Sequence, residues 1–287
     1  KALNALNAAV SIDPGNFDAH LELARIYSSK HALDRAIQSY KTAITLKPDS
    51  SDAHLKLATV FLQEERLEEA KNKFAATLKI DPNQTEALTS LGELFYNQSE
   101  YDQASNCFRR LVEIDPQNHS VRYYLAECFH HMGELDKALD EYLKVTEIND
   151  ERSDALTRLG QIYSSLEKWQ EAAKYYKKIF VVDPQNPVIH FELGKVYDKL
   201  NLLSDALIEF ETALKSDQHN AKIFSSMGLI HRKQGNLDLA IERFTKAIDL
   251  DPQDPLPHYE LGKAYINKGR LDKAIQEFNE ALHISPD

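Results

Sequence analysis

Apolar and small residues along this chain follow a helical period that is itself repeated. In the last complete unit, His258, Leu261, Gly262 and Tyr265 stand at i, i+3, i+4 and i+7, which predicts one face of an α-helix. A second stripe that contains Ala274 predicts another helix after it. This alanine recurs every 34 residues, as Ala36, Ala70, Ala104, Ala138, Ala172, Ala206, Ala240 and Ala274. A fixed period of this length predicts a stacked array of helical repeats.

Glycine and proline keep the same register as the alanines. All nine glycines fall at three positions of the unit, and Gly133, Gly235 and Gly269 share the one that ends the first helix. Glycine there predicts a left-handed C-terminal cap. Most prolines follow the second helix, which proline ends because it lacks an amide proton. Asp150 and Gln218 replace proline at two joints, where we expect the array to be softer.

The order of these residues resembles the tetratricopeptide repeat over essentially the whole chain: a bulky residue or His, x2-Leu-Gly/Ala-x2-Tyr/Phe, then Ala-x3-Phe/Tyr and Pro. The resemblance implies an all-α fold, a right-handed superhelical solenoid of antiparallel helix pairs. Residues 1–287 would form a single array in which residues 1–16 supply half a repeat. The complete repeats are 17–50, 51–84, 85–118, 119–152, 153–186, 187–220, 221–254 and 255–287.

Composition narrows the classes of partner. The formal net charge of −11 argues against general affinity for nucleic acid or anionic membranes, since both depend on Lys and Arg. No apolar run is long enough for a membrane-inserted helix. We expect a cytoplasmic protein. The periplasm is the alternative, because the chain begins inside a repeat and a signal peptide could have been removed before it.

The sequence carries no enzyme motif. It lacks the phosphate-binding, zinc-protease and nucleophile-elbow signatures, so we predict no catalytic, cofactor-binding or metal residues and no cofactor. Cys128, His130 and His131 offer only a weak metal signal, since they lie on one helix without a carboxylate partner. Cys107 and Cys128 are interpreted as reduced, partly buried thiols, with a redox pair as the alternative. Histidines at position 4 of the repeat, such as His54 and His190, are expected to pack between helices.

The resemblance directs the search for a site to the first helices, which line a concave groove in this family. Units one to four place six acids and two bases at the groove positions, whereas units five to eight place seven bases and four acids there. The predicted groove residues are Lys195, Lys199, Lys222, Arg232, Lys233 and Lys263, with the aromatic residues Tyr96, Tyr123, Tyr124, Phe191 and Tyr259. The alternative is that these charges are merely solvated.

The leading hypothesis is a non-catalytic scaffold for protein–protein interaction whose groove binds a partner segment. Aromatic anchors beside charged rims are typical of such surfaces, and the basic residues favour an acidic or phosphorylated segment. One alternative is the substrate-recruiting arm of a larger enzyme such as a glycosyltransferase, and another is an assembly factor of an envelope or secretion machine. We also expect end-to-end self-association, because apolar faces are left open at both ends of the array.

Overall fold

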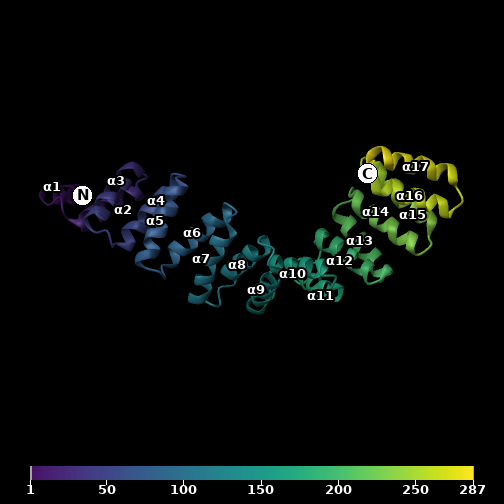
Figure 1. Cartoon of the computed structure of the whole chain (residues 1–287), viewed down its shortest axis with the longest axis horizontal. Helices are drawn as coiled ribbons and strands as arrows, with labels where there is room; N and C mark the ends of the chain where they lie inside the picture. The colour runs from purple at the N-terminus through teal and green to yellow at the C-terminus, as the bar shows by residue number, and fades with distance from the viewer. Residues whose placement is uncertain (1, 287) are drawn as a thin grey trace. The chain divides into compact units, whose positions relative to one another are not determined.

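The computed structural model describes residues 2–286, and every regular element in them is an α-helix (Figure 1). The first helices of the repeats are α2 (Phe17–Ser29), α4 (Ser51–Gln63), α6 (Thr85–Asn97), α8 (His119–His131), α10 (Ser153–Ser165), α12 (Pro187–Lys199), α14 (Ala221–Lys233) and α16 (Pro255–Asn267). The second helices are α3 (Leu33–Leu46), α5 (Leu67–Ile80), α7 (Tyr101–Ile114), α9 (Leu135–Ile148), α11 (Trp169–Ile179), α13 (Leu203–Ser216), α15 (Leu237–Leu250) and α17 (Leu271–Ile284). Helix α1 (Ala2–Ile12) belongs to the predicted half repeat, and residues 1 and 287 lie outside the described residues.

Each first helix begins at the first residue of a predicted repeat. Side chains just before these helices accept hydrogen bonds from backbone amides of the first turn, as when Asn16 Oδ1 accepts from the amide of Ala19 at 2.9 Å. Such caps satisfy amides that have no partner within the helix. The same role falls to Ser50, Gln84, Asn118, Asn186, Asn220 and Asp254.

The turn between the two helices of a repeat uses a left-handed residue in all eight complete repeats. Gly133, Gly235 and Gly269 have φ of 75°, 79° and 70°, which confirms the predicted caps. The other five repeats place a residue with a side chain in the same conformation, with φ from 55° to 61°: His31, Glu65, Ser99, Glu167 and Asn201. The left-handed conformation is therefore a feature of this position in the repeat, and it does not require glycine.

A small residue in the first helix allows the second helix to approach closely. A Cβ atom added to Gly194 would lie 2.5 Å from Cε1 of Phe210, a ring that is 1% exposed. Gly160 stands in the same relation to Tyr176, at 2.4 Å. Alanine serves at this position in the first repeat, where Ala24 is fully buried. In the core of each repeat, an aromatic ring of the second helix thus packs against a small residue of the first helix.

Histidines at position 4 pack as the sequence predicts. His54 and His190 are each 8% exposed, and their Nε2 atoms lie 3.0 Å from the carbonyl oxygens of Pro48 and Pro184. Burial lowers the pKa of His54. These rings attach the start of a first helix to the loop before it, so they are structural residues.

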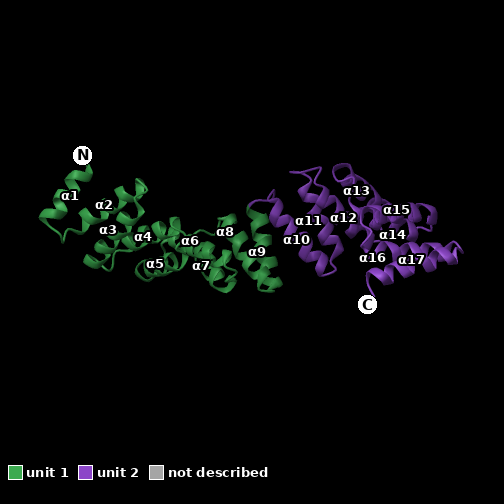
Figure 2. Ribbon diagram, turned by 90° about the horizontal axis from the view of Figure 1, so that it is seen from above, with its two compact units in different colours: residues 1–148 green, residues 149–287 purple. Residues whose placement is uncertain are grey.

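The described residues divide into two compact units, residues 1–148 and 149–287 (Figure 2). The boundary falls beside Asp150, one of the two joints that lack proline. Where two successive repeats belong to the same unit, the first helix of the later repeat packs on the second helix of the earlier one. A single array over residues 1–287 stays a prediction. Between residues 2 and 286, no helix combines the length and apolar character needed to cross a bilayer.

Candidate functional site

First helices of neighbouring repeats share one exposed surface in each unit. Direct contacts join α2 to α4, α12 to α14, and α14 to α16. Ion pairs also connect successive first helices: Arg25 with Asp52, Lys56 with Glu86, Lys233 with Asp198, and Arg232 with Glu260. We call the surface formed by α2, α4, α6 and α8 the first-helix face of unit 1, and the surface formed by α10, α12, α14 and α16 the first-helix face of unit 2.

Most of the predicted basic residues in unit 2 are already paired with carboxylates. The pairs are Lys195 with Glu192 at 2.9 Å, Lys233 with Asp198 at 2.5 Å, and both Arg232 and Lys263 with Glu260 at 2.9 and 3.0 Å. Lys199 and Lys222 are exposed, and within residues 2–286 neither forms an ion pair. Fewer basic side chains are therefore available to bind a partner than the count along the sequence suggests.

Arg232 and Glu260 form the most buried of these pairs. Only 8% of the Glu260 side chain and 23% of the Arg232 side chain are exposed. The Nε atom of Arg232 is buried without a hydrogen-bond partner, so the guanidinium is held between helices rather than extended into solvent. A buried carboxylate requires a compensating charge, which Arg232 of α14 supplies to Glu260 of α16. We therefore interpret this pair as part of the packing of α14 on α16.

A pocket of about 270 Å³ opens beside α10, α11 and α12. Its lining residues are Ser164, Ser165, Trp169, Glu192, Lys195, Val196 and Lys199. The ammonium of Lys199 lies 5.9 Å from the centroid of the Trp169 ring. Sequence reasoning had found both lysines but missed Trp169, which begins a second helix and so lies outside the positions that the family uses. Its signal was that it is the one tryptophan of the chain.

Aromatic side chains gather on the first-helix face of unit 1. Tyr96 makes edge contacts with Tyr101 and Tyr124, with ring centroids 5.5 and 5.6 Å apart. His131 stacks on Tyr101 at 4.4 Å, and Tyr123 lies 6.1 Å from Tyr124. Tyr124 is 39% exposed. The structure thus brings the three predicted tyrosines together and adds Tyr101 from α7, which the sequence reasoning missed.

A buried carboxylate lies beneath this aromatic cluster. Glu127 is 3% exposed, and its Oε1 accepts a hydrogen bond from the hydroxyl of Tyr142. Its Oε2 lies 3.9 Å from Nε2 of His131. The ring of His131 therefore has Tyr101 stacked on one face and the Glu127 carboxylate near its edge.

Phe191 and Tyr259 each make the same kind of packing contact within their own repeats. Each ring lies against the aromatic residue of the second helix in its own repeat, with centroids 5.8 Å apart for Phe191 and Phe210, and 5.7 Å for Tyr259 and Phe278. Tyr123 contacts Tyr142 in the same way at 5.8 Å. This periodic contact gives the position a structural role beside any role in binding.

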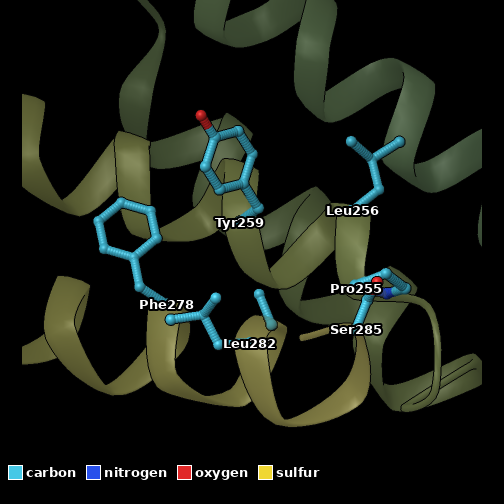
Figure 3. Close-up of a pocket in the computed structure, with 7 residues that line it drawn as sticks. Pro255, Leu256, Tyr259, Phe278, Leu282 and Ser285 are labelled. Carbon is cyan, nitrogen blue, oxygen red and sulfur yellow. The ribbon is translucent and has the colours of Figure 1, made fainter. Parts of the chain in front are cut away.

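An apolar pocket of about 550 Å³ lies between α16 and α17 (Figure 3). Pro255, Leu256, Tyr259, Phe278, Ala281, Leu282 and Ser285 line it. In the preceding repeat, Phe244 occupies the position of Phe278 and is fully buried with Leu261 of the following first helix. The pocket is therefore the face on which a further helix packs in a repeat array.

The two cysteines are free and buried in unit 1. Burial raises the pKa of Cys107 to about 11 and that of Cys128 to about 12, so both stay protonated at neutral pH. Over the described part of the chain, no three His, Cys, Asp or Glu side chains are grouped as metal ligands.

Comparison with known proteins agrees with the repeated helix pairs. Models described as tetratricopeptide repeat match residues 28–94, 61–123, 165–230, 255–287 and 1–51, and a model described as TPR repeat matches 228–269. A model of subunit 3 of the anaphase-promoting complex, or cyclosome, matches residues 97–179. No curated protein sequence matches the chain.

Several solved structures share the fold. YrrB, described as a TPR protein with an unusual peptide-binding site, is 24% identical, with 64% of this chain and 95% of YrrB covered and a TM-score of 0.56. MamA is 25% identical, with 56% and 95% covered and a TM-score of 0.54. A tetratricopeptide repeat protein from Parabacteroides merdae ATCC 43184 is 16% identical, with 90% and 98% covered and a TM-score of 0.51. The family models and the repeated helix pairs show that this chain belongs to the tetratricopeptide repeat family.

Proposed function

We propose that this chain is a non-catalytic scaffold that binds segments of a partner protein on the first-helix faces of its two units. The observation that carries the proposal is the aromatic cluster of Tyr96, Tyr101, Tyr123, Tyr124 and His131, in which Tyr124 and His131 are exposed to solvent. Tyrosine supplies a large contact area with few rotatable bonds, and for this reason it is enriched where proteins bind one another.

The charge of the partner segment follows from the residues that remain unpaired. On the first-helix face of unit 2, Lys199 and Lys222 are exposed and have no ion pair among the described residues, so this part of the face favours an acidic segment. Arg232, Lys233 and Lys263 add less, because neighbouring carboxylates already balance them. The preference for an acidic segment should be modest, since one exposed ion pair contributes only about 0.2–1 kcal/mol to binding.

A peptide library displayed on phage tests the function without a known partner. Peptides selected on the purified chain are labelled, and their affinity is measured by fluorescence anisotropy. We expect Tyr124→Ala to weaken binding roughly tenfold, as for a residue near the centre of an interface. Lys215→Glu is the matched control for Lys222→Glu, because Lys215 is an exposed lysine on the second helix α13. Peptides that respond to Lys215→Glu but not to Tyr124→Ala or Lys222→Glu would contradict the proposal.

End-to-end self-association would use the apolar pocket of α16 and α17 (Figure 3). Leu282 is 58% exposed there, and Tyr259 is 49% exposed. Covering such side chains removes apolar surface from water, which favours association. Sedimentation at increasing concentration should then show larger species that Leu282→Glu abolishes, whereas a monomer at all concentrations would exclude this mode.

A further inference from the structure

We propose that the pocket beside α10, α11 and α12 receives the side-chain carboxylate of an aspartate or glutamate in the bound segment. This assignment rests on the function proposed above and gives the chemistry of one anchor point. The sequence singled out Lys195 and Lys199 as part of a broad basic surface. The structure instead places them at the rim of a defined pocket with Trp169.

The two lysines of the pocket are not equivalent. Lys195 is engaged by both carboxylate oxygens of Glu192, at 2.9 and 3.0 Å. Lys199 is exposed and lies over the Trp169 ring, 5.9 Å from its centroid, and no described carboxylate forms an ion pair with it. An ammonium held over an aromatic face keeps its charge and its hydrogen-bond donors. Lys199 is therefore the group that can bind an incoming anion.

The charge of the lining residues favours a carboxylate over a phosphoryl group. Lys195, Lys199 and Glu192 together carry a net charge of +1. One carboxylate balances this charge. A phosphoryl group carries about −1.5 to −2 near neutral pH, so its excess charge would face Glu192.

The size and apolar lining indicate a single side chain. The pocket, at about 270 Å³, lies below the roughly 300–1,000 Å³ that is typical of sites for small molecules and cofactors. Trp169 and Val196 offer apolar surface to the methylene groups of an acidic side chain, while Lys199 reaches its carboxylate. A segment bound on the first-helix face of unit 2 would thus place one acidic residue here.

Trp169 provides the assay, because it is the one tryptophan in the chain. Its emission is followed as the full chain is titrated with hexaglutamate, with hexaglutamine, both blocked at their ends, or with inorganic phosphate. We expect a saturable change with hexaglutamate, none with hexaglutamine, and half-saturation by phosphate at a concentration at least about tenfold higher. Lys199→Gln should raise the hexaglutamate midpoint roughly fivefold, as for the loss of one exposed ion pair.

Two variants separate the pocket from general attraction to a basic surface. Lys199→Arg keeps the charge and should leave the midpoint within about twofold. Lys215→Gln removes an exposed charge from α13, outside the pocket, and should also leave it within about twofold. Absence of a saturable change, equal effects of Lys199→Gln and Lys215→Gln, or phosphate binding as tight as hexaglutamate would each overturn the assignment. If library peptides still depend on Tyr124 in that case, the proposed function stands and the pocket assignment alone fails.

Discussion

Replacement of Arg232 by methionine tests whether the most buried ion pair of the first-helix face is structural. Arg232→Met leaves the Glu260 carboxylate, whose side chain is 8% exposed, with Lys263 as its remaining partner at 3.0 Å. Breaking a fully buried pair costs about 3–5 kcal/mol, whereas breaking an exposed one costs at most about 1 kcal/mol. Because Arg232 is 23% exposed and Lys263 still compensates Glu260, we expect a loss of about 1–2 kcal/mol.

Hydrogen exchange measured by mass spectrometry locates this loss. Amides of α14 and α16 should exchange roughly 5–30 times faster in Arg232→Met than in the parent chain. Lys222→Met is the control on the same helix, because Lys222 is exposed and, among the described residues, forms no ion pair. Adding Glu260→Gln to Arg232→Met should restore part of the protection, since the uncompensated charge is gone. Equal exchange in Arg232→Met and Lys222→Met would refute the structural role and return Arg232 to the candidate binding residues.

Two further predictions concern packing and thiol chemistry. Gly194→Ala places a Cβ 2.5 Å from the buried ring of Phe210. The cost of overpacking, about 1–3 kcal/mol, should outweigh the gain in helix propensity of about 1 kcal/mol, so we expect unfolding at a lower urea concentration than in the parent chain. Gly262→Ala makes a similar contact with a ring that is partly exposed and can move, so its midpoint should fall less or rise. Cys107 and Cys128, with pKa values raised to about 11 and about 12 by burial, should react with iodoacetamide at pH 8 at least roughly 100-fold more slowly in the folded chain than in urea. Equal labelling rates in both conditions would show that the thiols are accessible.

The helix pairs could be predicted from sequence because the signals repeat. Every first helix begins where the period places it, and most of the residues just before these helices, such as Asn16 and Ser50, have short polar side chains that can cap a helix. The turn between the helices was recognised only where glycine occupies it, as in Gly133. His31 and Glu65 adopt the same left-handed conformation, because the packing of the two helices outweighs the modest cost for a residue with a side chain.

The candidate site was predicted less well, since charges can be counted along a sequence but their pairing depends on the fold. Arg232 and Glu260 lie on successive first helices, and so do Lys233 and Asp198. No pattern within one helix reveals that these groups meet. Trp169 was missed for a related reason, because it begins a second helix and reaches the pocket from outside the positions that the family uses.

Asp198 links this pairing to the acidic anchor point beside it. Asp198 precedes Lys199 on α12, and its carboxylate pairs with Lys233 of α14 at 2.5 Å. Lys233→Ala would leave the Asp198 charge uncompensated on the helix that carries Lys199, so hexaglutamate should bind roughly two- to fivefold more weakly although Lys233 does not line the pocket. Adding Asp198→Asn should restore the parent midpoint, because it removes that charge. If Lys233→Ala leaves the midpoint unchanged, the pair does not control the charge around Lys199, and its role is confined to joining the two helices.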